Sequence, residues 1–340
     1  MNKRWTHRPE GSSWGDFGED DQRGRMNLLT DDRRLRALAE VRTGKAFCLS
    51  LPLNKPGGSV LNSRRKSPIF HPVIREGHVH FNLPLRVADP RLTEVSSDEA
   101  VMLYNQYSTH WDGFAHKGRL FDVDGDGEEE KVFYNGYRIV DDAGEGTQGE
   151  LGAIAVSIAN MAESCVQGRG VLIDLRHHLG DERVEVGFDL LSEIMTKDNV
   201  TVEEGDILCI HTGIGQLIMD SGEDAPDPSI RTACAVLNGH DQKLLDWITE
   251  SGVAAIAADN LAVERSSTLG VNPHLCHRGP GLPLHDHCLF KLGIHLGELW
   301  YLSELAEWLR ENRRSRFLLT APPLRLPGAA GSPVTPIATV

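Results

Sequence analysis

The chain has little positive charge and no long apolar run, and each absence excludes a class of protein. Its 340 residues carry 35 Lys and Arg against 49 Asp and Glu, a net charge of −14. Nucleic acids and anionic membrane surfaces are bound through basic faces, so neither is expected as a partner. No stretch approaches the roughly 18 apolar residues of a transmembrane helix. The first five residues are polar and show no signal-peptide core, which predicts a cytoplasmic protein.

Several common motifs are also missing. The six cysteines contain no Cys-x-x-Cys pair, which predicts reduced thiols and excludes a disulfide or zinc framework. There is no Gly-x-Ser-x-Gly element, which removes the usual serine-hydrolase nucleophile. Aspartates at 122, 124 and 126 begin like an EF-hand loop, but Phe133 stands where its bidentate glutamate is required, so a turn is expected there.

What the chain does have is compact apolar runs that alternate with amphipathic stretches, as in α/β or mixed proteins. Short apolar runs bounded by Gly, Pro or Asp predict strands at 46–51, 171–173, 207–210 and 253–258. Helical spacing of apolar residues predicts helices at 188–195, 242–248 and 303–313. A further helix is expected to begin after the N-cap Thr30 and to end at Gly44.

Domain boundaries follow from composition. Residues 1–45 are expected to form an N-terminal arm and one helix, and residues 46–340 the main domain. Within it, residues 54–90 are rich in Gly, Pro, Ser and basic residues and predict a long excursion that can lie over a site. The tail 322–340 is rich in Pro and Gly yet apolar, so we expect it to pack back on the domain.

The fifteen histidines are the unusual feature of the composition, and residues 106–116 (QYSTHWDGFAH) hold the most informative of them. His110 and Asp112 are two residues apart, so on an extended chain both side chains point to the same face. An imidazole and a carboxylate that converge suit zinc or manganese. His116 can reach the same place after a turn at Gly113. The spacing alone fits a pair of polar residues on a solvated strand equally well.

A second cluster lies far along the chain, where His285-Asp286-His287 is followed by Glu298. A histidine and a glutamate from this cluster would complete a shell of four ligands. Taken alone, the same residues also fit exposed loop histidines and a glutamate at the start of a helix.

Polar residues also follow two predicted strands. Asp259 and Asn260 are candidates for groups that orient a ligand histidine. Asp174 follows the strand at 171–173, and an ion pair that fixes the strand end is the interpretation we favour there over a catalytic role.

Together these motifs resemble the cyclase family of metal-dependent hydrolases, which includes bacterial kynurenine formamidase, isatin hydrolase and trans-dienelactone hydrolase. The Thr-His-x-Asp-x-x-x-His string at 109–116 is the specific element. Weaker matches extend over most of the chain, at 14–15, 26–30, 43–44, 134–137, 257–260, 283–285 and 331–334. The resemblance implies an α/β fold, a single domain with central mixed β-structure flanked by helices, of the swivelling β/β/α kind.

The resemblance also implies roles for particular residues. Carried across position by position, the metal ligands would be His110, Asp112, His285 and Glu298, and His116 would be the catalytic histidine. Formamidase-like members have a further histidine where this chain has Gln106, and an amide is a poor replacement for an imidazole. We therefore expect one divalent metal per chain, Mn²⁺ or Zn²⁺, as in the isatin hydrolase-like members.

Substrate contacts are expected from four further residues near the motif. Gln106 stands at the missing ligand position, and three aromatic side chains could form an apolar wall for a flat ring: Trp111, Phe114 and Tyr134.

The implied reaction is hydrolysis of a C–N or C–O bond in a small carbonyl compound, with a cyclic amide or lactone as the expected substrate. The metal would polarise the carbonyl and lower the pKa of its bound water to about 7, and His116 would move the proton. A dehydratase or cyclase (a lyase) with the same metal and base, or a formamidase acting on an N-formyl aryl compound, remains an alternative. A binding protein without catalysis would not need a base beside the ligands. A homo-oligomer, dimer or tetramer, built with the N-terminal arm and the tail, is also expected.

Overall fold

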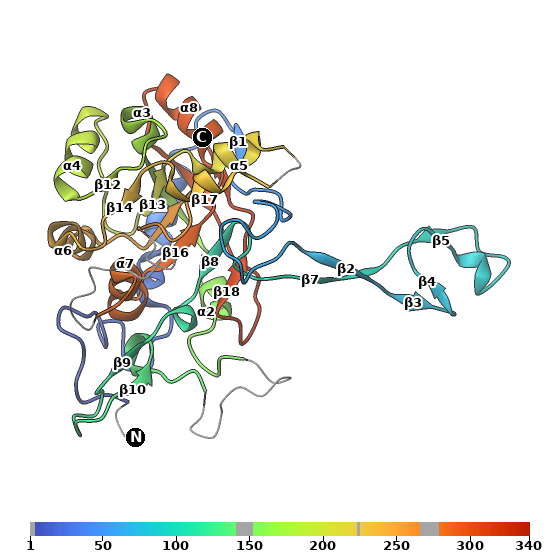
Figure 1. Cartoon of the computed structure of the whole chain (residues 1–340), viewed down its shortest axis with the longest axis horizontal. Helices are drawn as coiled ribbons and strands as arrows, with labels where there is room; N and C mark the ends of the chain where they lie inside the picture. Colours follow the sequence, from blue (N-terminus) through green and yellow to red (C-terminus); the bar gives the residue numbers. More distant parts are fainter. Residues whose placement is uncertain (1–3, 141–151, 223–224, 266–278) are drawn as a thin grey trace.

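One nine-stranded sheet carries the fold in this computed structural model, which describes residues 4–140, 152–222, 225–265 and 279–340 (Figure 1). In spatial order its strands are β1 (Ala46–Cys48), β19 (Ile337–Thr339), β17 (Arg316–Thr320), β11 (Gln167–Asp174), β13 (Ile207–His211), β15 (Ala255–Ala258), β16 (His295–Glu298), β8 (His110–Asp112) and β18 (Gly331–Pro333). The strands β11, β13, β15 and β16 run parallel, and the other neighbours pair antiparallel. The predicted mixed β-structure is confirmed.

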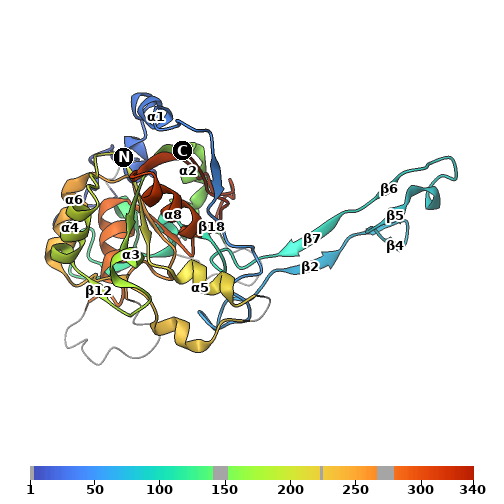
Figure 2. The ribbon, with the colours of Figure 1, turned by 90° about the horizontal axis from the view of Figure 1, so that it is seen from above.

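Helices cover both faces of this sheet, which explains why its central strands are continuous apolar runs. One apolar core lies under α4 (Phe188–Lys197), α6 (Gln242–Ser251) and the π-helix at Asp286–Leu292. The other core lies under α2 (Ile158–Glu163) and α8 (Ser303–Glu311). The views in Figures 1 and 2 show the sheet between these layers. Buried residues on both faces make this a single α/β domain.

The remaining elements are short. The helices are α1 (Asp31–Leu38), α3 (Leu175–Leu179), α5 (Ile214–Asp220) and α7 (Pro283–His285), with 3-10 turns at Gly24–Leu28, Leu85–Val87, Phe114–His116, Tyr134–Gly136 and Pro228–Thr232. The strand pairs outside the large sheet include β9 (Arg119–Phe121) with β10 (Glu130–Val132) and β12 (Glu185–Val186) with β14 (Val236–Leu237). Within the described residues, no helix is both long and apolar enough to cross a membrane.

The aspartate-rich string at 122–127 forms the turn between β9 and β10. The Asp122 carboxylate accepts hydrogen bonds from the backbone N–H groups of Gly125 (2.6 Å) and Gly127 (3.0 Å). These bonds form the predicted turn, and the strands β9 and β10 flank it at the places where an EF-hand has helices.

The first helix begins as predicted and ends earlier than predicted. The Thr30 hydroxyl accepts a hydrogen bond from the Arg33 N–H and caps α1. The helix ends at Leu38 and does not reach Gly44. The backbone N–H groups of Thr43 and Gly44 instead donate to the Val340 carbonyl (3.0 and 2.8 Å), which draws the chain into β1 beside β19.

The segment around Trp14 and Arg25 and the C-terminal tail both pack on the body of the protein. The Trp14 indole is fully buried and donates to the Phe290 carbonyl (2.8 Å). The Arg25 guanidinium donates to the carbonyls of Ile248 (3.0 Å) and Thr249 (2.7 Å) at the end of α6. The tail supplies β18 and β19, so the expectation that it packs back is confirmed.

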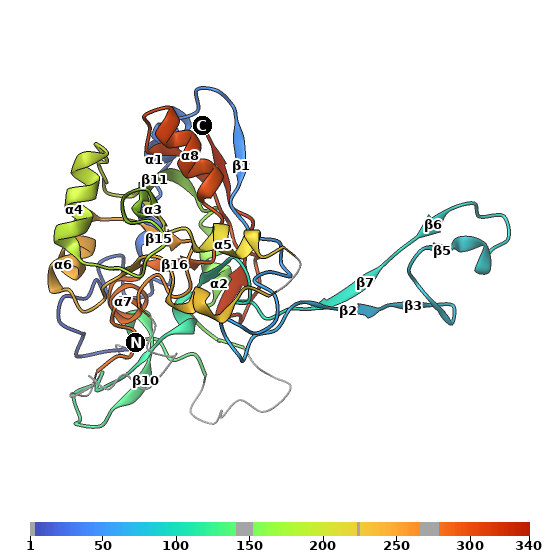
Figure 3. The same ribbon diagram turned by 45° about the horizontal axis from the view of Figure 1, so that its top comes forward.

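A long arm projects from the body between residues 69 and 102 (Figures 1, 2 and 3). Its strands pair as β2 (Ile69–Pro72) with β7 (Glu99–Met102), β3 (Ile74–Arg75) with β4 (His78–Val79), and β5 (Leu83–Pro84) with β6 (Val95–Ser96). The predicted excursion at 54–90 is therefore divided. Its first part stays on the body, where Arg65 donates to the Gln106 carbonyl (2.6 Å). The rest extends away, so the expectation that it lies over a site is wrong for the arm.

Candidate metal centre

The register of two antiparallel strands brings three of the predicted ligands together. In the pairing of β8 with β16, His110 lies opposite Glu298, and Asp112 is two residues further along β8 on the same face. Trp111, between them, points to the other face and pairs with Gly297. A Cβ at Gly297 would come within 2.7 Å of Trp300 Nε1 and 3.0 Å of the Trp111 ring, so glycine lets the strands close here.

His285 reaches the same point from the short helix α7. Glu264 holds it there, because its carboxylate accepts hydrogen bonds from the backbone N–H groups of Leu284 (3.0 Å) and His285 (2.9 Å). The same carboxylate accepts from His285 Nδ1 (2.9 Å) and is almost fully buried. This contact turns His285 Nε2 toward Glu298 Oε1 (3.2 Å) and Asp112 Oδ2 (3.8 Å).

Two of the four side chains, His110 and Asp112, leave buried ligand atoms without partners, and this fits a cation. His110 Nδ1 donates to the Ser108 carbonyl (2.7 Å), so the lone pair of Nε2 faces Asp112 Oδ1 and Glu298 Oε2, each 3.6 Å away. Neither oxygen of Asp112 nor His110 Nε2 has a hydrogen-bond partner among the described residues, although all three atoms are buried. Ligand atoms bound to one zinc at about 2.0–2.2 Å stand about 3.3 Å from each other, close to these separations. The donor set of two imidazoles and two carboxylates suits zinc or manganese.

Burial sets the protonation of these groups. It lowers the pKa of His110 to about 4, so its imidazole is neutral at pH 7, as a metal ligand must be. Burial and the neighbouring Glu298 carboxylate raise the pKa of Asp112 to about 8. Burial also opposes charge on His285, but its hydrogen bonds with Glu264 and Glu298 outweigh that effect and raise its pKa to about 9. Without a cation, Asp112 and His285 are therefore mainly protonated at pH 7, and a bound cation would displace these protons.

His116 lies beside the four predicted ligands and differs from them in exposure. It ends the 3-10 turn after Gly113, and its Nε2 is 3.7 Å from Asp112 Oδ2. Its side chain is 21% exposed, whereas those of Asp112 and Glu298 are 0% and 4% exposed. Burial and the nearby His285 charge lower the pKa of His116 to about 3. A neutral imidazole at the solvent side of the cluster can accept a proton.

Gln106 and Arg65 lie at the edge of the same cluster. A Cβ at Gly331, the residue paired with Asp112, would come within 2.7 Å of Gln106 Nε2. Arg65 and Gln106 also line a small hollow with Leu261 and with Leu299, the neighbour of Glu298. The charge of Arg65 is close enough to act on Asp112 and Glu298, which sequence reasoning did not anticipate.

The three predicted aromatic contacts are core residues in the structure. Trp111 packs edge-on against Trp300, with ring centroids 5.0 Å apart, and its indole donates to the Ala321 carbonyl. Phe114 stacks on His295 at 4.0 Å, and Tyr134 donates its hydroxyl proton to Asp21. All three are fully buried, so they have no exposed surface with which to form the expected apolar wall.

The structure also corrects the residues expected to orient a ligand histidine. Asp259 instead accepts hydrogen bonds from the backbone N–H groups of Thr212 (2.7 Å) and Gly213 (2.8 Å) ahead of α5. Asn260 donates to the Ala235 carbonyl (3.2 Å). The orienting role falls to Glu264, which lies in a loop where no periodicity or motif marks it. His287, the other histidine of the second cluster, instead has its Nε2 2.9 Å from the Leu245 carbonyl.

The ion pair predicted at the end of β11 is present and holds three elements together. Asp174 accepts from His211 Nδ1 on β13 (2.7 Å) and from Arg310 on α8 (2.9 Å). Burial opposes the charge of Asp174, but these partners outweigh it and lower the pKa of its carboxyl group.

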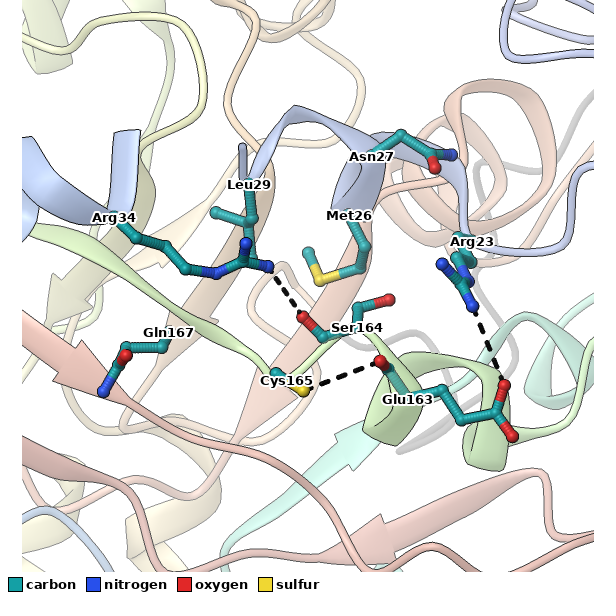
Figure 4. A pocket seen from close by; sticks show the side chains of 9 residues that line it. All are labelled: Arg23, Met26, Asn27, Leu29, Arg34, Glu163, Ser164, Cys165 and Gln167. Atoms are coloured by element: carbon teal, nitrogen blue, oxygen red, sulfur yellow. Dashed lines mark hydrogen bonds and ion pairs between the residues drawn. The ribbon is translucent and has the colours of Figure 1, made fainter. Parts of the chain in front are cut away.

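A separate groove of about 440 Å³ lies near the first helices, and Figure 4 shows its lining. Its charged groups pair within the lining: Arg23 contacts Glu163 (3.7 Å), and Arg34 donates to the Ser164 carbonyl (3.0 Å). None of the predicted metal ligands lines it.

Replacing Glu264 by glutamine should weaken metal binding by about 10- to 100-fold, the usual effect of losing a carboxylate behind a ligand histidine. The amide keeps the size of the side chain but loses the charge that holds His285 Nδ1–H. Chelator competition measures the change, and Glu185→Gln, at an exposed carboxylate paired with Arg265, is the control. Equal affinity in wild type and Glu264→Gln would show that His285 is not a ligand.

Comparisons relate the chain to known proteins. A family model described as "Putative cyclase" matches residues 48–265. A crystal structure described as a novel cyclase is 30% identical, has a TM-score of 0.74, and is aligned over 97% of each chain. Isatin hydrolase A from Labrenzia aggregata is 13% identical, with a TM-score of 0.54, over 91% of this chain and 98% of that chain. The Ralstonia solanacearum enzyme is 14% identical, with a TM-score of 0.53, over 91% and 97%. Comparison with curated protein sequences gives no match.

Proposed function

The chain belongs to the cyclase family, and from that premise we propose that it is a metal-dependent hydrolase that opens a small cyclic amide or lactone. One observation supports this most strongly. Buried and unpartnered ligand atoms of His110 and Asp112 face Glu298 and His285, with the more exposed His116 beside them. This combination suits hydrolysis, because one set of groups can hold a cation while a separate group moves a proton.

The four ligands would hold one divalent cation per chain, Mn²⁺ or Zn²⁺. When bound, such a cation polarises a substrate carbonyl and makes water a better nucleophile near neutral pH. His116 accepts the proton of the attacking water at Nε2 and returns it to the leaving nitrogen or oxygen. That nitrogen lies 3.7 Å from Asp112 Oδ2, which places the proton acceptor directly beside the cluster.

Arg65 places a positive charge where the carboxylate of the product can bind. Opening a lactone or a cyclic amide produces a carboxylate, and Arg65 lines the hollow next to Leu299 and Gln106. Its guanidinium is anchored by one hydrogen bond to the Gln106 carbonyl, which leaves further N–H donors for an anion. We therefore place the acyl half of the substrate on the Arg65 side of the cluster.

The reaction is tested with a panel of lactones, imides and formamides in ¹⁸O-labelled water, with metal-loaded protein. A hydrolase incorporates one ¹⁸O atom from solvent into the carboxylate product. A product that forms without solvent oxygen would identify a lyase or cyclase and contradict the proposal. Turnover of N-formyl aryl compounds alone would assign the formamidase alternative.

Replacing Arg65 by glutamine should raise the inhibition constant of the carboxylate product by about 10- to 100-fold, because one charge-assisted hydrogen bond is lost. Steady-state kinetics with added product measures it. Arg64→Gln is the matched control, since the neighbouring arginine is exposed and contacts Asn62. Similar product inhibition in both variants would place the carboxylate elsewhere.

A further inference from the structure

A second polar cluster lies at the carboxyl ends of β11 and β13, separate from the candidate metal centre. Asp174 and His211 are the last residues of these parallel strands and stand opposite each other in their register. Ser303, the first residue of α8, completes the cluster, and α8 lies beside α3 at this end of the sheet (Figures 1 and 3). In the sheet, β15 stands between β13 and β16, the strand that carries Glu298. The carboxyl ends of parallel strands are the usual place for functional groups in α/β proteins.

The three side chains are joined in the order carboxylate, imidazole, hydroxyl. Asp174 Oδ1 is 2.7 Å from His211 Nδ1, and His211 Nε2 is 3.2 Å from Ser303 Oγ. Burial opposes the charge of Asp174, but its partners lower the pKa of the carboxyl group, so at pH 7 it is ionised and only accepts hydrogen bonds. His211 therefore carries its proton at Nδ1, and the lone pair of Nε2 accepts from the Ser303 hydroxyl. A serine whose proton is taken by an oriented histidine is an activated nucleophile.

The surroundings of His211 suit the positive charge that proton transfer would create on it. The Asp259 carboxylate is fully buried, and its Oδ2 is 3.9 Å from His211 Nε2. Arg310 donates to the other oxygen of Asp174 (2.9 Å) and so fixes the carboxylate that orients the ring. His211 is only 4% exposed, whereas Ser303 is half-buried and can be reached from solvent. The base is therefore enclosed, and the nucleophile is accessible.

The first turn of α8 supplies hydrogen-bond donors beside the serine. The first bond of the helix runs from the Ala306 N–H to the Leu302 carbonyl (2.9 Å), and Leu302 provides no side-chain cap. The N–H groups of residues 303–305 therefore have no acceptor within the helix. They lie at the positive end of the helix dipole, where they can stabilise negative charge that develops on a carbonyl oxygen attacked by Ser303.

We propose that Ser303 and His211 are the catalytic residues of a second, metal-independent site that hydrolyses small esters, with Asp174 as a positioning residue. Ser303 Oγ attacks the ester carbonyl carbon while its proton passes to His211 Nε2. The bond between that carbon and the alcohol oxygen then breaks, and His211 gives the proton to the departing alkoxide. Water cleaves the acyl-serine by the same route, so one ester and one water give one acid and one alcohol. Such a triad is defined by geometry and not by sequence order, which is why a chain without Gly-x-Ser-x-Gly can contain it.

A small alkyl fluorophosphonate tests the site on the full chain, with and without a chelator. Ser303 Oγ forms a bond to phosphorus, fluoride leaves, and His211 takes the serine proton. Intact mass and peptide mapping should show one phosphonyl group per chain, at Ser303, at the same rate under both conditions. His211→Asn should slow the labelling by about two to four orders of magnitude. Ser157→Ala is the control, at a half-buried serine that starts α2 without a capping hydrogen bond, and should be labelled as fast as the wild type.

Asp174 acts through His211, so its variant needs a readout that separates binding from chemistry. Asp174→Asn should lower the maximal labelling rate by at least about 100-fold. The probe concentration that gives half of the maximal rate should stay unchanged, whereas a distorted site would change both quantities.

Hydrolysis of p-nitrophenyl acetate in the presence of a chelator gives a second measurement. The wild type should hydrolyse the ester, and Ser303→Ala should lose this activity. Two results with the wild type would overturn the proposal however the variants fold: no label at Ser303, or labelling that requires the metal. Equal labelling of His211→Asn and wild type, or chelator-resistant ester hydrolysis that persists in Ser303→Ala, would also overturn it. None of these results bears on the metal-dependent reaction, which the chelator removes.

Discussion

Replacing His116 by alanine or asparagine should lower kcat by about two to four orders of magnitude, the usual contribution of a positioned general acid–base. Metal content should stay near that of the wild type. His116 Nε2 stands 3.7 Å from Asp112 Oδ2, at the exposed side of the cluster, whereas His110 and His285 are enclosed by it. The prediction separates a group that moves protons from a group that binds metal.

Metal analysis and steady-state kinetics on the same preparations measure both effects. His240→Asn, at an exposed histidine outside the cluster, is the control for loss of an imidazole and should change neither. Parallel loss of metal and activity in the His116 variants would make His116 a ligand. Unchanged activity would make it a structural residue.

The sequence predicted the parts of this site that depend on local geometry. The spacing of His110 and Asp112 places both on one face of any strand, and β8 is such a strand. The 3-10 turn after Gly113 then returns His116 to the same side. Each step involves neighbouring residues only, so the sequence pattern was sufficient to predict where these three side chains lie.

The positions of the remaining predicted ligands depend on pairings between distant segments. Glu298 meets His110 because of the register between β16 and β8, which no local pattern reveals; only the family resemblance selected it. The expectation for Asp259 failed for a related reason. That expectation assumed a site at the ends of the central parallel strands. The cluster instead forms on β16 and β8, and β8 is next to the last strand of the sheet.

The aromatic residues show a different limit. Trp111 lies between two predicted ligand positions, so strand alternation already sends it to the opposite face and into the core.

The exposure of the arm at residues 69–102 could not be predicted from its apolar residues either. Spaced among Gly, Pro and charged residues, they resemble an ordinary loop, and only the β2–β7 pairing shows that they cover two faces of one ribbon.

Replacing His110 or Glu298 by alanine should remove most of the bound metal, which in the wild type should be about one ion per chain. Structural zinc sites with four ligands bind with about 10–16 kcal/mol, so loss of one ligand costs on the order of 3 kcal/mol, or about a hundredfold in affinity. Activity should fall with the metal. Asp112→Asn is a third variant of nearly equal size, which removes a charged predicted ligand without leaving a cavity.

Thermal unfolding with and without a chelator gives a readout that does not depend on activity. A ligand that binds only the folded protein stabilises it by about 3–4 kcal/mol at 100 to 1,000 times its dissociation constant. Chelation should therefore lower the unfolding temperature of the wild type by several degrees, and it should change that of Asp112→Asn far less. The Asn variant should match the chelated wild type closely, because the raised pKa of Asp112 already favours its neutral form when no cation is present. Full metal occupancy in the His110, Asp112 and Glu298 variants would place the metal elsewhere in the chain. Two ions per chain in the wild type, with Gln106 in contact with the second ion, would refute the single-metal site.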